Sequence, residues 1–325
     1  MNIGLMTLMR CVQGAISSLA LCLVAGLAVA QTAYPSRPVE LTILWPAGTA
    51  PDVVARALAQ GMSQQLGQPV LVINKPGAGG AVAYRYVQQQ KPDGYSLVLN
   101  SNSISTTFHG GTLPFNYTAF DPVAQVSVEL PILVVRADSP FNDLKEMVAF
   151  AKAHPEELRI GNSGVGSHIH IVAESFFADQ KAPVTHVPFA SAFSVTSLLG
   201  GHLDASVTLP GSVSAMVKAG KLKVLGVFGT QREPSFPEVK TATEQGFNSQ
   251  FDMWRGIAAP KGMPPAVMAR LEDAVRKTVE SPEYKAQGAL QGFLPVYQPA
   301  AVFGKRIAGD DVVIGEAMTK AGLAK

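Results

Sequence analysis

Two glycine-containing segments carry residue types that can bind a small anion through backbone groups. They read Pro-Ala-Gly-Thr-Ala-Pro-Asp over residues 46–52 and Gly-Asn-Ser-Gly-Val-Gly-Ser over residues 161–167. Each follows an apolar run and precedes a stretch with helical spacing, so the free N–H groups of a helix N-terminus would face a bound anion. Glycine allows close approach to the backbone, and the Thr and Ser hydroxyls add donors. Both segments predict anion-binding turns; the alternatives are a well-capped helix for the first and a structural left-handed turn for the second.

A third glycine-rich segment, Asn74–Gly80, does not have the spacing of a nucleotide-binding loop. It lacks the G-x-x-x-x-G-K-[ST] pattern of phosphate loops. It also lacks the third glycine of the dinucleotide pattern G-x-G-x-x-G, because position 82 is Val82. We expect a tight turn that packs a helix against a strand.

The residues that could support catalysis or metal binding lack the necessary partners. Ser163 is followed by Gly164 and Val165, which excludes the G-x-S-x-G nucleophile pattern. His168 and His170 are two positions apart and would face different directions on a helix, and no third ligand stands at metal-site spacing. His170 and Glu174 are four positions apart, a spacing that predicts a pair of neighbouring side chains on the helix surface. The sequence therefore predicts no catalytic residue, no metal and no cofactor.

The elements that would position the two turns alternate between strand and helix. Short apolar runs predict strands and 3.6-residue spacing predicts helices. This alternation predicts an α/β fold of mostly parallel sheets flanked by helices on both faces. We expect strands at 41–45, 70–74, 95–100, 132–136, 158–161, 185–189, 204–209, 223–228, 251–259 and 294–298, and helices at 53–66, 81–89, 144–154, 168–180, 195–199, 212–219, 264–279, 282–291 and 300–321.

So many strands favour two lobes over a single sheet, with extended crossings near 129–137 and 250–259. In open α/β sheets, ligands bind at the carboxyl ends of strands, so we expect the two turns to face one cleft. The predicted organisation is residues 1–30 as a signal peptide, 31–130 with 255–325 as lobe 1, and 131–254 as lobe 2.

The N-terminal residues have the order of parts found in a secretory signal peptide. Arg10 precedes an apolar run from Ala15 to Leu27, and Ala28-Val29-Ala30 offers small residues for cleavage. The run is shorter than the roughly 20 residues that span a bilayer, although a retained membrane anchor is the alternative. Both cysteines, Cys11 and Cys22, lie inside this segment, so the exported chain would contain no disulfide. We expect a periplasmic protein that is not embedded in the membrane.

The overall composition excludes two further classes of protein. The 325 residues carry a formal net charge of +2, which argues against a nucleic-acid binder with a basic stripe. Hydrophobic residues make up 47% of the chain and charged residues 15%, a balance that excludes intrinsic disorder.

Short motifs in a fixed order give the chain a family likeness. From about residue 34 onward it resembles the Bug, or TctC-type, solute-binding proteins of tripartite tricarboxylate transport systems. The motifs that carry this resemblance are Pro35–Pro38, Pro46–Arg56, Asn74–Gly80, Pro92–Tyr95, Ser163–Ser167 with His170 and Glu174, His186–Phe189, Leu198–Gly201 with Asp204, Gly220–Leu222 and Ala259–Gly262.

The resemblance implies a two-lobed Venus-flytrap fold that closes on a small organic mono- or dicarboxylate. It also implies delivery of the ligand to membrane transporter subunits, and we expect a monomer. Backbone amides, hydroxyls and waters of facing turns would hold the carboxylate. Carried over onto this sequence, the contacts are Ala47, Gly48, Thr49 and Asp52 in one lobe and Ser163, Gly166 and Ser167 in the other, with Phe189 and Asp204 lining the cleft.

The chain departs from the family pattern where the ligand would sit. Thr49 replaces a second glycine and Pro51 stands where the family has another residue. Phe189-Ala190-Ser191 replaces the usual Tyr-x-Gly. These changes predict a pocket that is narrower or of different polarity, and they leave the identity of the carboxylate open.

Two other functions remain as alternatives to transport. The same closure could signal to a membrane receptor, which would make the protein a carboxylate sensor. A periplasmic hydrolase would need a nucleophile–base pair or a metal, for which the sequence has no motif. The aromatic residues Trp45, Phe108, Phe189 and Trp254 could line an aromatic-carboxylate pocket, but core packing is the favoured interpretation.

Overall fold

The computed structural model describes residues 34–189 and 193–325. The expected signal peptide, both cysteines and the departure at Ser191 lie outside these residues. The chain divides into a short unit, Met1–Ser36, and a compact unit, Arg37–Lys325, and the following description concerns the second. No helix in the described ranges combines the length and the apolar character needed to cross a membrane.

The first sheet of the compact unit has six strands, in the order β11-β4-β10-β3-β1-β2. Strand β1 pairs in parallel with β2 and β3, whereas β10 and β11 form antiparallel pairs. The bounds are β1 Val39–Ile43, β2 Val70–Asn74, β3 Ser96–Ser101, β4 Phe120–Glu129, β10 Met253–Pro260 and β11 Leu294–Pro299.

The second sheet has five strands, in the order β7-β6-β8-β5-β9. Strand β6 pairs in parallel with β7 and β8, and β5 is antiparallel to β8 and β9. The bounds are β5 Ile132–Arg136, β6 Arg159–Asn162, β7 Thr185–Pro188, β8 Ala205–Thr208 and β9 Leu222–Val227.

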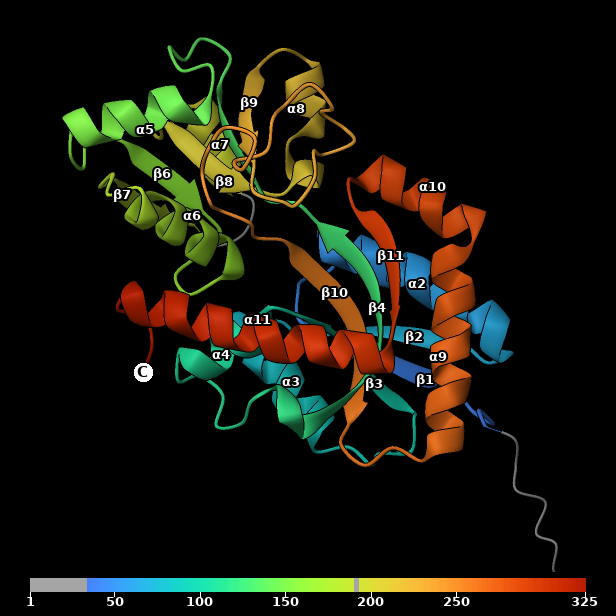
Figure 1. Ribbon diagram of the computed structural model, residues 1–325. Coiled ribbons are helices and arrows are strands. Elements are labelled where there is room, and N and C mark those ends of the chain that lie inside the picture. The colour runs from blue at the N-terminus through green and yellow to red at the C-terminus, as the bar shows by residue number, and fades with distance from the viewer. Residues whose placement is uncertain (1–33, 190–192) are drawn as a thin grey trace, which may run out of the picture. The chain divides into compact units, whose positions relative to one another are not determined.

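Helices flank both sheets (Figure 1). Around the first sheet, α2, α9 and α10 contact one another, and α11 contacts α4; α6 and α7 contact strands of the second sheet. The helices are α2 Ala50–Leu66, α3 Ala81–Gln88, α4 Ser103–His109, α5 Leu144–Ala153, α6 His168–Asp179, α7 Phe193–Leu199, α8 Ser214–Lys218, α9 Pro265–Glu280, α10 Pro282–Gln291 and α11 Ala300–Lys320, with 3₁₀ turns η1 Ala78–Gly80, η2 Tyr117–Ala119 and η3 Pro210–Ser212.

The expected two-lobed α/β architecture is confirmed, but the expectation of mostly parallel sheets is wrong. Both sheets are mixed, because the strands that link them run against their neighbours. The chain leaves the first sheet at the end of β4 and enters the second at β5, after two intervening residues. It returns from β9 to β10, which is antiparallel to both β4 and β3.

Two elements of the first sheet region were not predicted from the sequence. Strand β4, Phe120–Glu129, contains Asp, Pro, Gln and Ser, which hide its apolar run, although most of its residues are buried. Helix α4, Ser103–His109, is short and rich in Ser and Thr, which have only modest helix propensity. Tertiary burial stabilises both elements despite their weak local signals.

Candidate functional site

The first predicted turn joins β1 to α2 and is mostly exposed. Ala47 and Gly48 are exposed, and Thr49 is half-buried at the N-cap of α2. Gly48 has a φ of +80°, a left-handed conformation that L side chains rarely adopt. The Thr49 hydroxyl donates a hydrogen bond of 2.7 Å to the carbonyl oxygen of Pro46, which closes the turn on itself.

Asp52 organises this turn from the first turn of the helix. Its buried carboxylate accepts hydrogen bonds from the Gly48 N–H at 2.9 Å and from Arg56 Nε and Nη2 at 2.9 and 3.0 Å. A further bond of 2.9 Å comes from the side-chain amide of Asn74. Burial raises the pKa of Asp52, but the bonds from Arg56, Gly48 and Asn74 outweigh it and hold the pKa below its usual value. The carboxylate is therefore ionised and its charge is compensated by Arg56.

The second predicted turn joins β6 to α6, and its hydrogen bonds resemble those of the first. Gly164 and Gly166 have φ values of +107° and +72°. Ser167 caps α6 by accepting the His170 N–H at 3.1 Å, and its hydroxyl lies 3.0 Å from that of Ser163. The Gly166 N–H donates to His170 Nδ1 at 3.1 Å. In both turns, a glycine N–H is thus held by a side chain four residues later.

Phe189 lies beside the second turn. Strands β6 and β7 are parallel, with Asn162 opposite Pro188 in the register. The Phe189 N–H donates to the carbonyl oxygen of Asn162 at 3.0 Å. The structure therefore brings Ser163, Gly166, Ser167 and Phe189 together at the carboxyl ends of these two strands.

Asp204 does not belong to this group, and its predicted place in the cleft is corrected. It precedes β8, where it accepts the Arg159 N–H at 2.8 Å and Arg159 Nε at 3.1 Å. Arg159 is the first residue of β6, whereas Ser163 follows the last. At about 3.3 Å per residue, Asp204 lies roughly 13 Å from the turn, at the opposite end of the strands.

The candidate aromatic residues divide between the core and its margin. Trp254 is fully buried, packs edge-on against Phe303 and donates its indole N–H to Asp310 at 2.7 Å. Trp45 is half-buried, and the guanidinium carbon of Arg255 lies over its ring, 4.6 Å from the ring centre. Core packing therefore accounts for Trp254, as the sequence analysis favoured.

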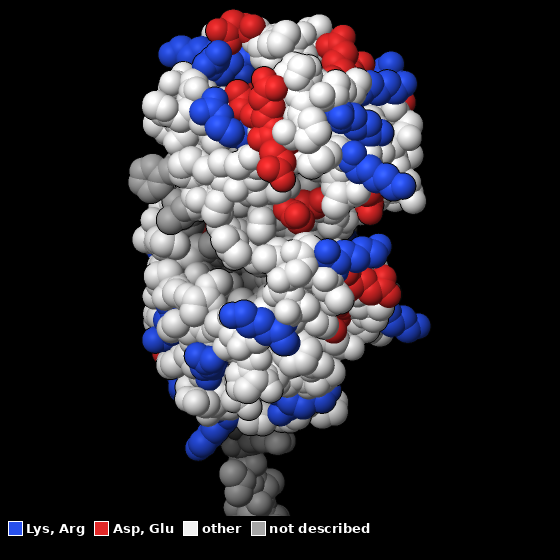
Figure 2. All heavy atoms as spheres, turned by 90° about the vertical axis from the view of Figure 1, so that its left-hand side faces the viewer, with Lys and Arg blue, Asp and Glu red and all other residues white. Residues whose placement is uncertain are grey.

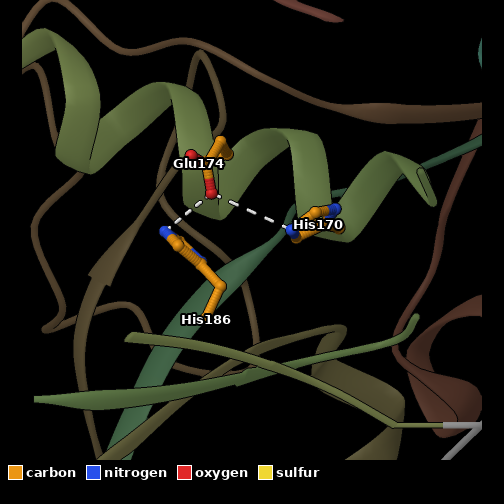
Figure 3. A group of neighbouring side chains, drawn as sticks. All are labelled: His170, Glu174 and His186. Atoms are coloured by element: carbon orange, nitrogen blue, oxygen red, sulfur yellow. Dashed lines mark ion pairs between the residues drawn. The ribbon is translucent and has the colours of Figure 1, made fainter. Parts of the chain in front are cut away.

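A cluster of three ionisable side chains lies next to the second turn. Glu174 projects from α6 between His170 of the same helix and His186 of β7 (Figure 3). Glu174 Oε2 lies 2.8 Å from His186 Nε2 and 3.8 Å from His170 Nε2. The three donor atoms lie within 4.8 Å of one another. Sequence analysis missed His186 as a neighbour, because the fold alone brings β7 beside α6.

On the face drawn in Figure 2, Lys and Arg lie at separate places, and Asp and Glu lie among them mainly in its upper half. The formal net charge of the whole chain is +2, so its acidic and basic residues nearly balance.

Comparisons with known proteins identify the family. The model of the tripartite tricarboxylate transporter family receptor, TctC, matches residues 54–322. The chain belongs to the TctC family. A UPF0065 protein of Bordetella pertussis is 35% identical over 83% of this chain and 84% of its own length.

Solved TctC-like structures share the fold. A TctC solute-binding protein from Polaromonas, solved without ligand, is 34% identical, with a TM-score of 0.77 over 88% of this chain and 99% of the other. MatC of Rhodopseudomonas palustris, solved with bound malate, is 25% identical, with a TM-score of 0.77 over 87% and 99% of the two chains. The resemblance to TctC receptors noted in the sequence is confirmed, and with it membership of a solute-binding receptor family.

Proposed function

We propose that this protein is an exported receptor that captures a small organic carboxylate and delivers it to a tripartite tricarboxylate-type transporter. The observation that carries the proposal is the pair of turns described above, one in each sheet. Each follows the carboxyl end of a strand, precedes a helix of more than ten residues and holds a glycine N–H through its own side chains. Membership of the TctC receptor family supports the same function.

The donors that we assign to the ligand are those that the turns do not use internally. Helix geometry leaves the first N–H groups without intrahelical acceptors, which at α6 means His168 and Ile169. The paired hydroxyls of Ser163 and Ser167 can turn one hydrogen outward. We expect a carboxylate held by several such donors to bind with a micromolar dissociation constant, a free energy of about −8 kcal/mol.

The lobes that would close on the ligand follow the two sheets. We propose that lobe 1 comprises residues 31–130 with 255–325 and lobe 2 residues 131–254, with the hinge in the crossing segments. Closure would bring Ala47, Gly48 and Thr49 to the ligand from the first lobe. Phe189, beside the second turn, would contact the ligand's carbon chain. Residues 1–30 would direct export to the periplasm and be removed.

Malate is the first ligand to test, because MatC, which shares the fold and a quarter of the sequence, was solved with malate. Native mass spectrometry of the protein, purified from its periplasmic fraction without refolding, should reveal a co-purified acid of low mass. Thermal unfolding with malate and a panel of mono- and dicarboxylates should show a rise in Tm with at least one acid. Esters or amides of that acid should give no rise, since they lack the anionic carboxylate.

A further inference from the structure

The hydrogen bond between Gly166 and His170 fixes which ring nitrogen of His170 carries the proton. The Gly166 N–H donates to Nδ1 at 3.1 Å, so Nδ1 is an acceptor. A neutral imidazole has one N–H, and in this ring it must therefore be on Nε2. His170 is buried, with a side chain only 7% exposed, so water does not readily replace this bond.

Glu174 favours the same tautomer through its charge. The Glu174 carboxylate faces Nε2 of His170 at 3.8 Å, where an Nε2–H is stabilised and a lone pair would be repelled. The same carboxylate accepts a hydrogen bond from Nε2–H of His186 at the shorter distance of 2.8 Å (Figure 3). This bond holds the carboxylate against β7. The bond from His186 is the main reason why the pKa of Glu174 lies below its usual value, so the carboxylate stays charged.

We propose that Glu174 and His186 are positioning residues for the binding turn: they hold His170 as the Nε2–H tautomer, whose Nδ1 fixes the Gly166 N–H. This inference rests on the proposed function of Ser163–Ser167 as a ligand-binding turn. Fixing Gly166 orients the peptide that precedes Ser167, the N-cap of α6. The helix N–H groups and the Ser163–Ser167 hydroxyl pair are thereby ordered before the ligand binds.

The hydrogen bonds around His170, Glu174 and His186 are less compatible with a bound metal ion than with a proton on Nε2 of each ring. Binding through Nε2 of both rings would leave their protons on Nδ1. At His170, that proton would face the Gly166 N–H, and two donors would oppose each other. At His186, Nδ1 is buried without a hydrogen-bond partner among the described residues, so its N–H would find no acceptor. The hydrogen-bond pattern thus assigns the cluster to tautomer control.

The positioning role predicts that acid releases the turn. Burial is the main cause that lowers the pKa of His170; His186 on β7 lowers it further, and Glu174 on its own helix opposes the shift. Helix α11 also packs against α6, but the charge of its Arg306 acts on His168. Once His170 is protonated, Nδ1 carries a hydrogen and can no longer accept from Gly166. Ligand affinity should therefore fall as the pH drops below the ordinary histidine pKa.

Nitrogen-15 NMR of the ligand-free protein tests this directly. We expect the Nε2–H tautomer at His170 and slow hydrogen exchange at the Gly166 amide. Glu174→Gln should raise the Nδ1–H fraction and accelerate the exchange of Gly166. Glu157→Gln is the matched control, because it makes the same change of charge in another His–Glu pair, the exposed pair of Glu157 with His154. The Nδ1–H tautomer at His170 in the wild-type protein would overturn the proposal, and so would unchanged hydrogen exchange of the Gly166 amide in Glu174→Gln. Binding of equimolar Zn²⁺ with His170 as the Nδ1–H tautomer would also overturn it.

Two substitutions at His170 separate positioning from folding. In His170→Asn, the side-chain oxygen can accept near the place of Nδ1, so malate affinity should stay near the wild-type value. In His170→Leu, no acceptor remains, and affinity should fall about tenfold, the worth of one hydrogen bond. Equal affinity in both variants would contradict the positioning role. If no carboxylate binds although tautomer and exchange behave as expected, the proposed function fails and the hydrogen-bond assignment stands.

Discussion

The backbone N–H of Gly48 donates a 2.9 Å hydrogen bond to Oδ2 of Asp52, four residues later. The turn in the other sheet repeats this relationship between Gly166 and His170 at 3.1 Å. In both places, a side chain of the first helical turn reaches back to a left-handed glycine. The turns are thus ordered without a ligand, which lowers the entropy that binding must overcome.

Alanine at either glycine should weaken ligand binding more than it weakens the fold. A Cβ at Gly48 or Gly166 would meet no heavy atom within 4 Å, so the cost comes from the left-handed φ, about 1–2 kcal/mol. To relieve that strain the turn must move, which displaces its donors. Gly220→Ala is the matched control, with a φ of +66° and equally open space. Calorimetry and urea unfolding should show similar stability losses in all three variants and an affinity loss only at Gly48 and Gly166.

Removing the Asp52 carboxylate should loosen the first turn. Asp52→Ala leaves Arg56, Asn74 and the Gly48 N–H without their shared acceptor, and we expect a stability loss of about 1–3 kcal/mol in urea unfolding. Asp52→Asn keeps one acceptor oxygen for Gly48 and should lose less. Equal losses in the two variants would mean that charge pairing with Arg56, and not the bond to Gly48, is the main contribution.

The crossing strands are joined by a buried ion pair between Arg255 of β10 and Glu129 of β4. The side chains are only 1% and 3% exposed. Glu129→Ala would leave a buried guanidinium without its carboxylate and should lower the free energy of unfolding by about 3–5 kcal/mol. Replacing both residues by Met should restore much of this loss, since no unpaired charge remains. Glu280→Ala breaks the exposed pair with Arg276 and should change stability little.

His168 should make the fold less stable in mild acid. Burial is the main cause that lowers its pKa from 6.5 to about 4, so the folded chain keeps this ring neutral where the unfolded chain protonates it. The neutral ring lowers the free energy of unfolding by nothing above pH 6.5. As the pH falls from 6.5 toward 4, the free energy of unfolding declines because of His168, by about 3 kcal/mol in total. In His168→Leu, that part of the decline should disappear. Equal slopes of unfolding free energy against pH in both proteins would contradict the assignment.

The sequence predicted much of the fold because many elements have strong local patterns. The predicted strand 70–74 and helix 282–291 coincide with β2 and α10. It failed where tertiary burial overrides local preference, as in β4 with its Pro122 and its polar residues. The antiparallel course of β10 could not be predicted either, because strand direction in a crossing depends on the whole topology.

The candidate site was predictable in part for the same reason. Turns after strands are visible as glycine-rich breaks, and both such turns occur where they were predicted. Asp204 was misplaced because it precedes its strand, so it lies at the amino end, away from Ser163. The capture of the Gly48 N–H by Asp52 and the approach of His186 to Glu174 depend on side-chain geometry, which spacing alone does not specify.

Calorimetric titration of malate and related carboxylates into the native protein and into Ser167→Ala tests the central claim most directly. Ser281→Ala is the control, because Ser281 caps α10 by accepting the Tyr284 N–H as Ser167 caps α6 at His170. Both variants should lose about 1 kcal/mol of stability. We expect micromolar binding of at least one acid to the native protein and to Ser281→Ala, and at least tenfold weaker binding to Ser167→Ala. Absence of binding by every acid, or equal affinity in the two variants, would contradict the account.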